Sequence, residues 1–236
     1  MMLVKEFVRG SPGRREKVKS ILIRLATAVA LLLSGCLGGR AVARYQAENE
    51  SPPAQPAQWS FDSDPADGLP QGAVVFSGTW AVRAEPDAPS PPNALCQTGR
   101  AEFPALSLGD AVYTDLMMWT RFRPISGRTD QAAGLIFRVQ DKDDYYILRA
   151  NALENNVNFY KYAGGRRSTL KEGHTAVLSG QWQELRVEAS GNELRGFLNG
   201  ELVVETSDET YQAGQIGLWT KADSVTCFDD VTVGSA

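Results

Sequence analysis

Two neighbouring stretches decide the fold, Gly134-Leu-Ile-Phe-Arg-Val-Gln-Asp141 and Tyr145-Tyr-Ile-Leu-Arg-Ala-Asn151. Both are short and rich in β-branched and aromatic residues, which are the residues enriched in strands. The run Asp141-Lys-Asp-Asp144 between them contains acidic residues of the kind that favour a tight turn. The two stretches therefore predict two β-strands joined by a turn.

Alternation assigns the faces of these strands, because successive side chains of a strand point to opposite sides of the sheet. One set is apolar and is expected to face the core: Leu135, Phe137, Val139, Tyr146, Leu148 and Ala150. The other set includes Arg138, Tyr145 and Arg149, which are expected to share the outer face.

Short strands of the same kind continue from Trp59 almost to the C-terminus. The further expected strands are 112–122, 157–162, 182–189, 193–198, 202–205, 215–219 and 225–233. The pair Asn199-Gly200 is a two-residue hairpin signal, because both residues tolerate positive φ. No stretch of twelve residues in this region keeps a helical period. The sequence therefore predicts an all-β sandwich or barrel.

Composition argues against several classes of function. The 236 residues carry a formal charge of -4, which argues against a nucleic-acid partner. A single histidine argues against a multi-histidine metal site and against a histidine-based catalytic triad. Three cysteines are too few for a disulfide-dense small domain and too scattered for a zinc ribbon.

The N-terminal segment, residues 1–35, has the pattern of a secretory signal peptide. Seven basic and two acidic residues precede or flank an apolar run, Leu25–Leu33, that is short for a membrane span. Leu33-Ser34-Gly35-Cys36 resembles a bacterial lipobox, which implies cleavage before Cys36 and a lipid on its sulfur. A signal peptide without lipid and a single membrane anchor are the alternatives. Removal of residues 1–35 would leave a chain with a net charge of -9.

Two further segments follow the expected cleavage site. Residues 36–57 contain Gly38-Gly39 and the proline-rich run Ser51-Pro-Pro-Ala-Gln-Pro-Ala57, which predicts a stiffened tether behind the lipid-bearing Cys36. Residues 58–236 then form the expected β domain.

A family resemblance rests on the two opening stretches together with Gly217-Leu-Trp-Thr-Lys-Ala-Asp-Ser-Val-Thr226 and Phe228-Asp-Asp-Val231. These motifs resemble the concanavalin A-like, laminin-G-like jelly-roll domains. More narrowly, their order over residues 59–233 is similar to the bacterial 3-keto-disaccharide hydrolase domain family. The resemblance implies an all-β, two-sheet antiparallel jelly-roll sandwich with one concave sheet. That fold carries lectins, glycosidases and adhesion modules alike, so function has to be argued from the site.

A polar and aromatic face is the main candidate for ligand binding. Aromatic rings stack on the apolar face of a sugar, and arginine, asparagine and lysine donate to its hydroxyl groups. The candidate ligand-binding residues are Arg138, Tyr145, Arg149, Asn151, Trp219 and Lys221. The alternative is a half-solvated sheet face on which long cations cover apolar surface. Arg166 and Arg167 are expected at a solvated hairpin tip, with ligand binding as the alternative.

Two carboxylates are candidate catalytic residues. Ordinary glycoside hydrolysis needs a pair of carboxyl groups, and the compact Glu-x-Asp strand of the jelly-roll glucanases is missing here. A 3-keto sugar has an acidified C–H bond, so elimination needs only one base and a stabiliser of the enolate. Glu154 or Asp223 is the candidate base, with Arg138, Arg149 or Lys221 as the stabiliser.

No metal-ligand set and no organic cofactor is assigned, although a structural calcium ion has two candidate positions. One is the Asp141–Asp144 turn, and the other is Asp229-Asp230 together with Asp62 or Asp64.

The cysteines other than Cys36 form one candidate pair. Because the resemblance places the terminal strands of the fold together, Cys96 and Cys227 are expected to form a disulfide in an oxidising compartment. Two buried thiols are the alternative.

The sequence as a whole predicts a lipid-anchored lipoprotein of the bacterial cell envelope, facing the periplasm or the exterior from the outer membrane. Its expected function is binding of a glycan or glycoside on the concave sheet. A 3-keto-glycoside hydrolase that uses the same face and a protein-interaction module of the envelope are the alternatives. The expected partners are a carbohydrate and, through the N-terminal lipid, the membrane.

Overall fold

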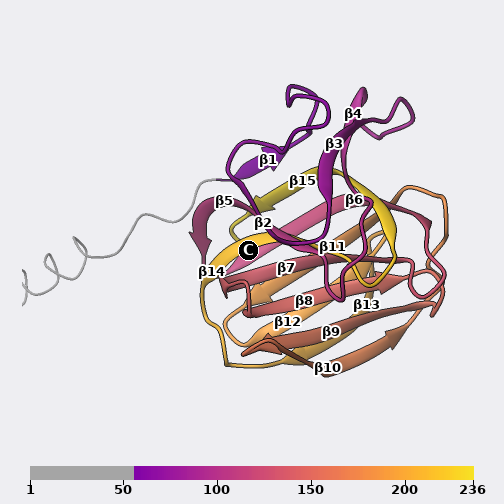
Figure 1. Cartoon of the computed structure of the whole chain (residues 1–236). Helices are drawn as coiled ribbons and strands as arrows, with labels where there is room; N and C mark the ends of the chain where they lie inside the picture. Colours follow the sequence, from indigo (N-terminus) through magenta and orange to yellow (C-terminus); the bar gives the residue numbers. More distant parts are fainter. Residues whose placement is uncertain (1–55) are drawn as a thin grey trace, which may run out of the picture. The chain divides into compact units, whose positions relative to one another are not determined.

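The computed structural model describes residues 56–236 of the chain, which form two antiparallel sheets packed face to face (Figure 1). Among these residues there is no helix that could cross a membrane. The expected signal peptide, Cys36 and all but the end of the expected tether lie outside the described residues.

One sheet has eight strands. Its order is β13-β12-β11-β6-β15-β4-β3, and β1 pairs with the far part of β15. The bounds of these strands are β1 (Ala57–Trp59), β3 (Trp80–Ala84), β4 (Asn93–Gln97), β6 (Leu116–Ser126), β11 (Gln183–Ser190), β12 (Glu193–Leu198), β13 (Glu201–Ser207) and β15 (Val225–Gly234).

The other sheet has seven strands in the order β10-β9-β8-β7-β14-β5-β2. The bounds of these strands are β2 (Ala73–Ser77), β5 (Ala105–Tyr113), β7 (Ala132–Asp141), β8 (Asp144–Asn151), β9 (Asn156–Ala163), β10 (Arg166–His174) and β14 (Gly214–Trp219). The two sheets confirm the antiparallel sandwich that the sequence predicts.

The apolar core lies between the sheets and is built by alternate residues of each strand. Leu135, Phe137 and Leu148 from the seven-stranded sheet meet Leu185 and Phe228 from the eight-stranded one, and all five are completely buried. Burying a large apolar side chain stabilises the fold by about 1.5–3 kcal/mol. The alternation of the two opening stretches therefore assigns these core residues correctly.

The tight turns follow the expected residues. Asn199 and Gly200 join β12 to β13 with φ values of 51° and 86°. Positive φ at both central residues of a two-residue turn matches the twist of the two strands, which is why this pair forms the hairpin.

A β-bulge at Arg138 overturns part of the predicted facing. Arg138 has a φ of 49°, and the pairing of β7 shifts on both sides of the strand at this point. An irregular residue resets the alternation of a strand. Val139 therefore packs on the outer side of the sheet with Tyr145 and not in the core. The guanidinium of Arg138 does not lie on the outer face and donates instead to the carbonyl oxygen of Thr114.

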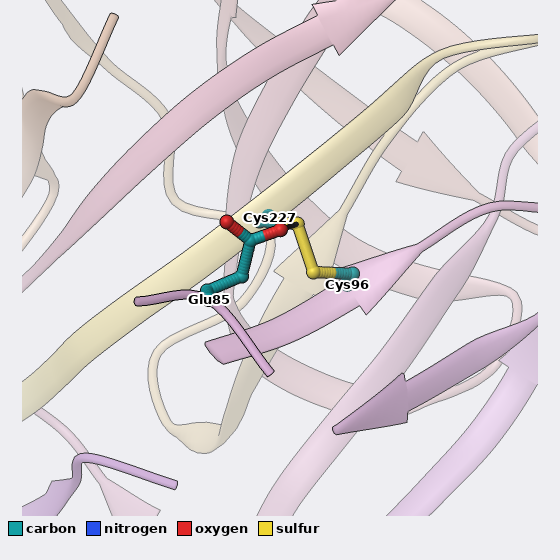
Figure 2. A group of neighbouring side chains, drawn as sticks. All are labelled: Glu85, Cys96 and Cys227. Carbon is teal, nitrogen blue, oxygen red and sulfur yellow. Dashed lines mark hydrogen bonds between the residues drawn. A yellow bond between two sulfur atoms is a disulfide. The ribbon is translucent and has the colours of Figure 1, made fainter. Parts of the chain in front are cut away.

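The disulfide between Cys96 and Cys227 confirms the predicted pairing (Figure 2). The two residues are direct partners on the neighbouring strands β4 and β15. Glu85 lies beside the bond, with its Oε1 atom 3.7 Å from the sulfur of Cys227. These three residues are the only group of metal-ligating side chains within 56–236 that come close enough to share an ion, and the disulfide occupies both sulfurs.

Asp229 ties the loop between β3 and β4 to strand β15. Its fully buried carboxyl group accepts the backbone N–H of Ser90 at 2.9 Å and that of Asp230 at 2.8 Å. Burial, opposed by the hydrogen bond from Ser90, raises the pKa of Asp229 to about 6 from its ordinary value of 3.8. The folded protein therefore keeps the side chain neutral up to a higher pH than the unfolded chain does.

We expect Asp229 to make the protein less stable as the pH rises from 4 to 7. Well below pH 3.8 the side chain is protonated in both states, whereas near pH 6 it is ionised in the unfolded chain and still half protonated in the fold. The cost, fully developed only well above pH 6, amounts to about 3 kcal/mol for a shift of this size. Asp229→Asn removes this dependence, which denaturant unfolding at several pH values measures.

Asp67→Asn is the matched control, because Asp67 has an exposed side chain. It should keep the pH profile of the wild type. If Asp229→Asn also keeps that profile, the buried carboxyl group does not carry the effect.

Candidate functional site

The outer face of the seven-stranded sheet, which points away from the core, is aromatic at its centre. Trp219 of β14 and Tyr145 of β8 lie on this face, as the sequence predicts, but only 0% and 1% of their surface is exposed. The ring of Phe103 stacks on Trp219 at 5.6 Å between centroids, and Tyr162 stacks on Tyr145 at 4.9 Å. Neither predicted ring therefore offers an open face to a sugar.

Arg167 of β10 packs its guanidinium on these rings. Its central carbon lies 4.5 Å from the centroid of Tyr160, 4.9 Å from Phe103 and 5.8 Å from Trp219. Burial lowers the pKa of Arg167 below its ordinary value, although the group stays charged. The prediction of a solvated hairpin tip was therefore wrong for Arg167, while Arg166 is exposed.

A second part of the outer face is polar and centres on Arg149, which is 1% exposed. Its Nη2 atom donates to Glu154 Oε2 at 2.6 Å and to Asn156 Oδ1 at 2.7 Å. The amide of Asn156 donates in turn to the same oxygen of Glu154 at 3.0 Å. The ring of Tyr160 lies 5.2 Å from the guanidinium. Glu154 keeps 42% of its side chain exposed, so this group opens to solvent.

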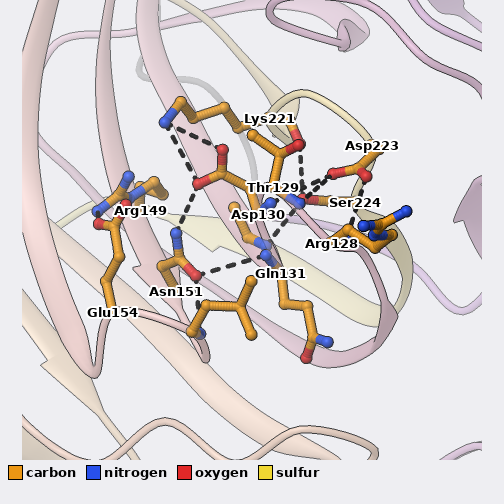
Figure 3. A network of polar contacts seen from close by, with 12 residues as sticks. Arg128, Thr129, Asp130, Gln131, Arg149, Asn151, Glu154, Lys221, Asp223 and Ser224 are labelled. Carbon is orange, nitrogen blue, oxygen red and sulfur yellow. Dashed lines mark hydrogen bonds and ion pairs between the residues drawn. The ribbon is translucent and has the colours of Figure 1, made fainter.

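Asp130, Asn151 and Lys221 form the neighbouring part of the same network (Figure 3). Lys221 Nζ lies 3.0 Å from Asp130 Oδ2, and the amide of Asn151 donates to Asp130 Oδ1 at 2.7 Å. Asp130 is 1% exposed, whereas the side chain of Lys221 is 24% exposed. We call the whole group the polar cluster: Asp130, Arg149, Asn151, Glu154, Asn156 and Lys221.

The strand pairing explains why these residues come together. Asn151 ends β8 and is opposite Asn156, which begins β9, while Ala132 of β7 pairs with Asn151 from the other side. Lys221 follows the end of β14, the other neighbour of β7. Strand ends at one end of the sheet thus deliver every member of the cluster.

Asp223 holds the loop that carries Asp130 (Figure 3). Its carboxylate accepts the backbone N–H groups of Arg128, Thr129 and Asp130 at 3.0, 2.9 and 3.2 Å. The hydrogen bond from the N–H of Arg128, helped by the other two, lowers the pKa of Asp223 well below its ordinary value. A carboxylate fixed in this way is a weak base, so its placement gives Asp223 a positioning role.

Glu154 is also a weaker base than an ordinary glutamate. Burial alone would raise its pKa, but the hydrogen bond from Asn156 and the charge of Arg149 outweigh burial and lower it. The carboxylate is therefore well suited to accept further hydrogen bonds while it stays ionised.

Arg138 does not join the cluster. Its guanidinium donates to the carbonyl oxygen of Thr114 at 3.0 Å and to that of Tyr211 at 3.0 Å, and none of the side chain is exposed. It links the β5–β6 turn to the segment before β14. The bulge at Arg138 is the physical reason for this departure from the predicted face.

Carboxylates at both candidate calcium positions accept hydrogen bonds from other groups of the protein. Asp144 accepts the N–H of Gly164 at 3.1 Å and the hydroxyl of Tyr211 at 2.8 Å. Asp229 and Asp230 both bind the hydroxyl of Ser90. A structural calcium ion stays a prediction.

Comparison with known sequences gives one family and one curated relative. Residues 98–234 match the profile of the 3-keto-alpha-glucoside-1,2-lyase-like domain. The chain is also 27% identical over 165 residues to a levanase of Bacillus subtilis (strain 168). That match covers 68% of this chain and 22% of the levanase, so the chain spans about a fifth of that relative.

Solved structures agree with the fold. The carbohydrate-binding module CBM66 from Bacillus subtilis is 25% identical with a TM-score of 0.60, over 70% of this chain and 96% of that one. A Bacillus subtilis protein of unknown function with a galectin-like fold is 13% identical with a TM-score of 0.54, over 78% and 97%. The second similarity concerns the fold alone. Because the family profile matches more than half of its residues, the chain belongs to the 3-keto-alpha-glucoside-1,2-lyase-like domain family.

Proposed function

We propose that the domain binds a glycan at the polar cluster. The observation that carries this proposal is the arrangement of Arg149 and Glu154, a buried guanidinium that holds a half-exposed carboxylate in a fixed position. A sugar presents pairs of hydroxyl groups, each of which both donates and accepts. Glu154 accepts from such a pair and Lys221 donates to it, and both side chains are held by buried partners.

The charges of this region fit a neutral glycan. Arg149, Lys221 and Arg167 are positive, and Glu154 and Asp130 are negative, so the charges nearly cancel and leave +1. A neutral sugar is recognised through hydrogen bonds and not through the net charge of its site. The network also spares much of the side-chain ordering that binding otherwise costs.

The relatives support the same function. The CBM66 structure is described as a carbohydrate-binding module, and it aligns with most of this domain. The levanase is named for its action on levan, which makes levan the first polysaccharide to test.

We expect Glu154→Gln to weaken levan binding about tenfold or more, because a hydrogen bond to a charged group contributes about 1.5–3 kcal/mol. Calorimetric titration of the purified domain measures the affinity. Glu193→Gln is the matched control, since Glu193 is also paired with an arginine but lies on β12 of the other sheet.

The proposal is overturned if the variant binds as tightly as the wild type. It is equally overturned if neither levan nor any glycan of an array of neutral polysaccharides is retained by the folded domain.

The family match favours a second candidate, elimination on a 3-keto glucoside. Glu154 would remove the proton from C2, next to the ketone, with Arg149 and Lys221 stabilising the enolate; the enolate would then break the C1–O bond, and the substituent would leave as an alcohol after taking up a proton. The lowered pKa of Glu154 makes it a poor base, so binding remains the preferred function. Release of a 3-keto sugar by the wild type and its loss in Glu154→Gln would establish the enzyme in place of the binder.

We also propose that Cys36 carries a lipid that holds the domain at the cell envelope. The support is the basic and apolar segment before Leu33-Ser34-Gly35-Cys36. Several acyl chains, at about 0.8 kcal/mol per buried methylene, keep a protein at a membrane.

We expect the full chain, expressed in a bacterium, to incorporate labelled palmitate and to sediment with membranes. Cys36→Ser should abolish both properties, because the lipid is attached to the sulfur. Unchanged labelling or unchanged sedimentation in the variant would refute the anchor, and Cys96→Ser with Cys227→Ser controls for the other thiols.

A further inference from the structure

We propose that a groove around Trp59 is a second carbohydrate-binding site, specific for a neutral sugar. The groove has a volume of about 650 Å³, which is within the range of small-molecule sites. Segments from four places in the chain line it: the end of β1 and the residues after it, the turn before β2, the middle of β5 and the start of β14.

Trp59 gives the groove an aromatic wall. Its indole is half-buried and lies over the backbone of Gly109, where a side chain would begin 3.4 Å from the ring. The indole also packs against the core cluster, and as a half-buried side chain it keeps part of its surface open to the groove. A ring held in this way, unlike the covered Trp219, presents surface on which the apolar face of a sugar stacks.

Polar side chains surround the indole. Three amides and two carboxylates line the groove, all of them exposed or half-buried: Gln58, Gln71, Gln215, Asp64 and Asp110. Amides both donate and accept, and carboxylates accept strongly, so the set matches a rim of sugar hydroxyl groups.

The charge of the lining selects against anions. It contains two carboxylates and neither lysine nor arginine. A phosphate, a sulfated glycan or a uronic acid would meet repulsion with no compensating cation. An indole that offers a stacking surface and five side chains that accept hydrogen bonds from hydroxyl groups match a saccharide without an anionic group.

The groove is separate from the polar cluster. Gln215 lies at the start of β14 and Lys221 just beyond its end, so six residue steps of largely extended chain, about 20 Å, separate them. The second site is therefore independent of the proposed function. Its consequence, binding of one chain at two sites, rests on the proposed function. Two sites at this spacing let one polysaccharide chain engage the domain twice, which raises its apparent affinity.

The experiment follows the indole N–H signals of the wild-type domain by NMR while a levan trisaccharide or a cellulose trisaccharide is added. We expect the Trp59 signal, assigned with Trp59→Phe, to shift with at least one of these sugars and with a saturable dependence. A Trp59 signal that neither sugar moves would overturn the second site.

Asp110→Ala tests the groove without disturbing the core packing of Trp59, because Asp110 is exposed. It should weaken the Trp59 titration about tenfold, the effect of losing one strong hydrogen bond. Glu209→Ala, at an exposed position outside the groove, should leave it unchanged. Equal titrations in Asp110→Ala and the wild type would contradict the assignment.

Glu154→Gln separates the two proposals. If both sites exist, this variant keeps the Trp59 titration and loses the other binding event. If only the polar cluster fails as a site, Trp59 still responds and Glu154→Gln has no effect on any titration. For the bivalent consequence, Asp110→Ala should lower the affinity for polymeric levan more than that for the trisaccharide at the polar cluster, and equal losses would refute it.

Discussion

Burial of the central strands of the seven-stranded sheet on both faces is the constraint from which the candidate site follows. In β8, seven of the eight residues are buried, including the charged Arg149. A buried charge is tolerated only where it is paired and hydrogen-bonded, because the protein interior solvates it poorly. Glu154 and Asn156 accept hydrogen bonds from Nη2 of Arg149, and Lys221 and Asn151 pair with the carboxylate of Asp130. The demand for pairing therefore fixes the geometry of the polar cluster.

The aromatic centre of the outer face has a different task. Phe103 and Arg167 lie against Trp219, so the largest ring of the sheet contributes packing and not an open platform. A cation–π contact contributes about 0.5–1 kcal/mol at an exposed site and about 2 kcal/mol when desolvated, and such contacts help to keep the half-buried Arg167 in place. The part of this face left for a ligand is consequently the charged end, where Glu154 and Lys221 reach solvent.

The sequence predicts the fold well because the fold depends on local patterns. Period-two alternation identifies the core residues Leu135, Phe137 and Leu148, and the Asn199-Gly200 pair identifies a hairpin. The alternation fails at Arg138, since nothing in the residue types announces a positive φ at an arginine.

The candidate site is only partly predictable from the sequence, because it depends on the paths of loops and on which side chains cover the outer face of the sheet. Arg149, Asn151, Glu154 and Lys221 were identified, since polar residues at strand ends stand out in apolar strands. That Asp223 binds three backbone N–H groups follows from the path of the 127–131 loop, which no pattern gives. The place of Arg167 over the rings had one signal in the sequence, its position at the start of a strand directly after Gly164-Gly165.

The ion pair with Glu154 that allows Arg149 to be buried also decides which chemistry the polar cluster performs best. A general base works well when its pKa lies near the working pH, which requires a carboxylate that is destabilised as an anion. Burial pushes Glu154 in that direction, but the hydrogen bond from Asn156 and the charge of Arg149 reverse the effect and lower its pKa. The same contacts keep the carboxylate ionised, oriented and ready to accept hydroxyl groups. The carboxylate of Glu154, which neutralises the buried Arg149, is thus a rigid hydrogen-bond acceptor. Such a group is better suited to binding a sugar than to removing a proton from it.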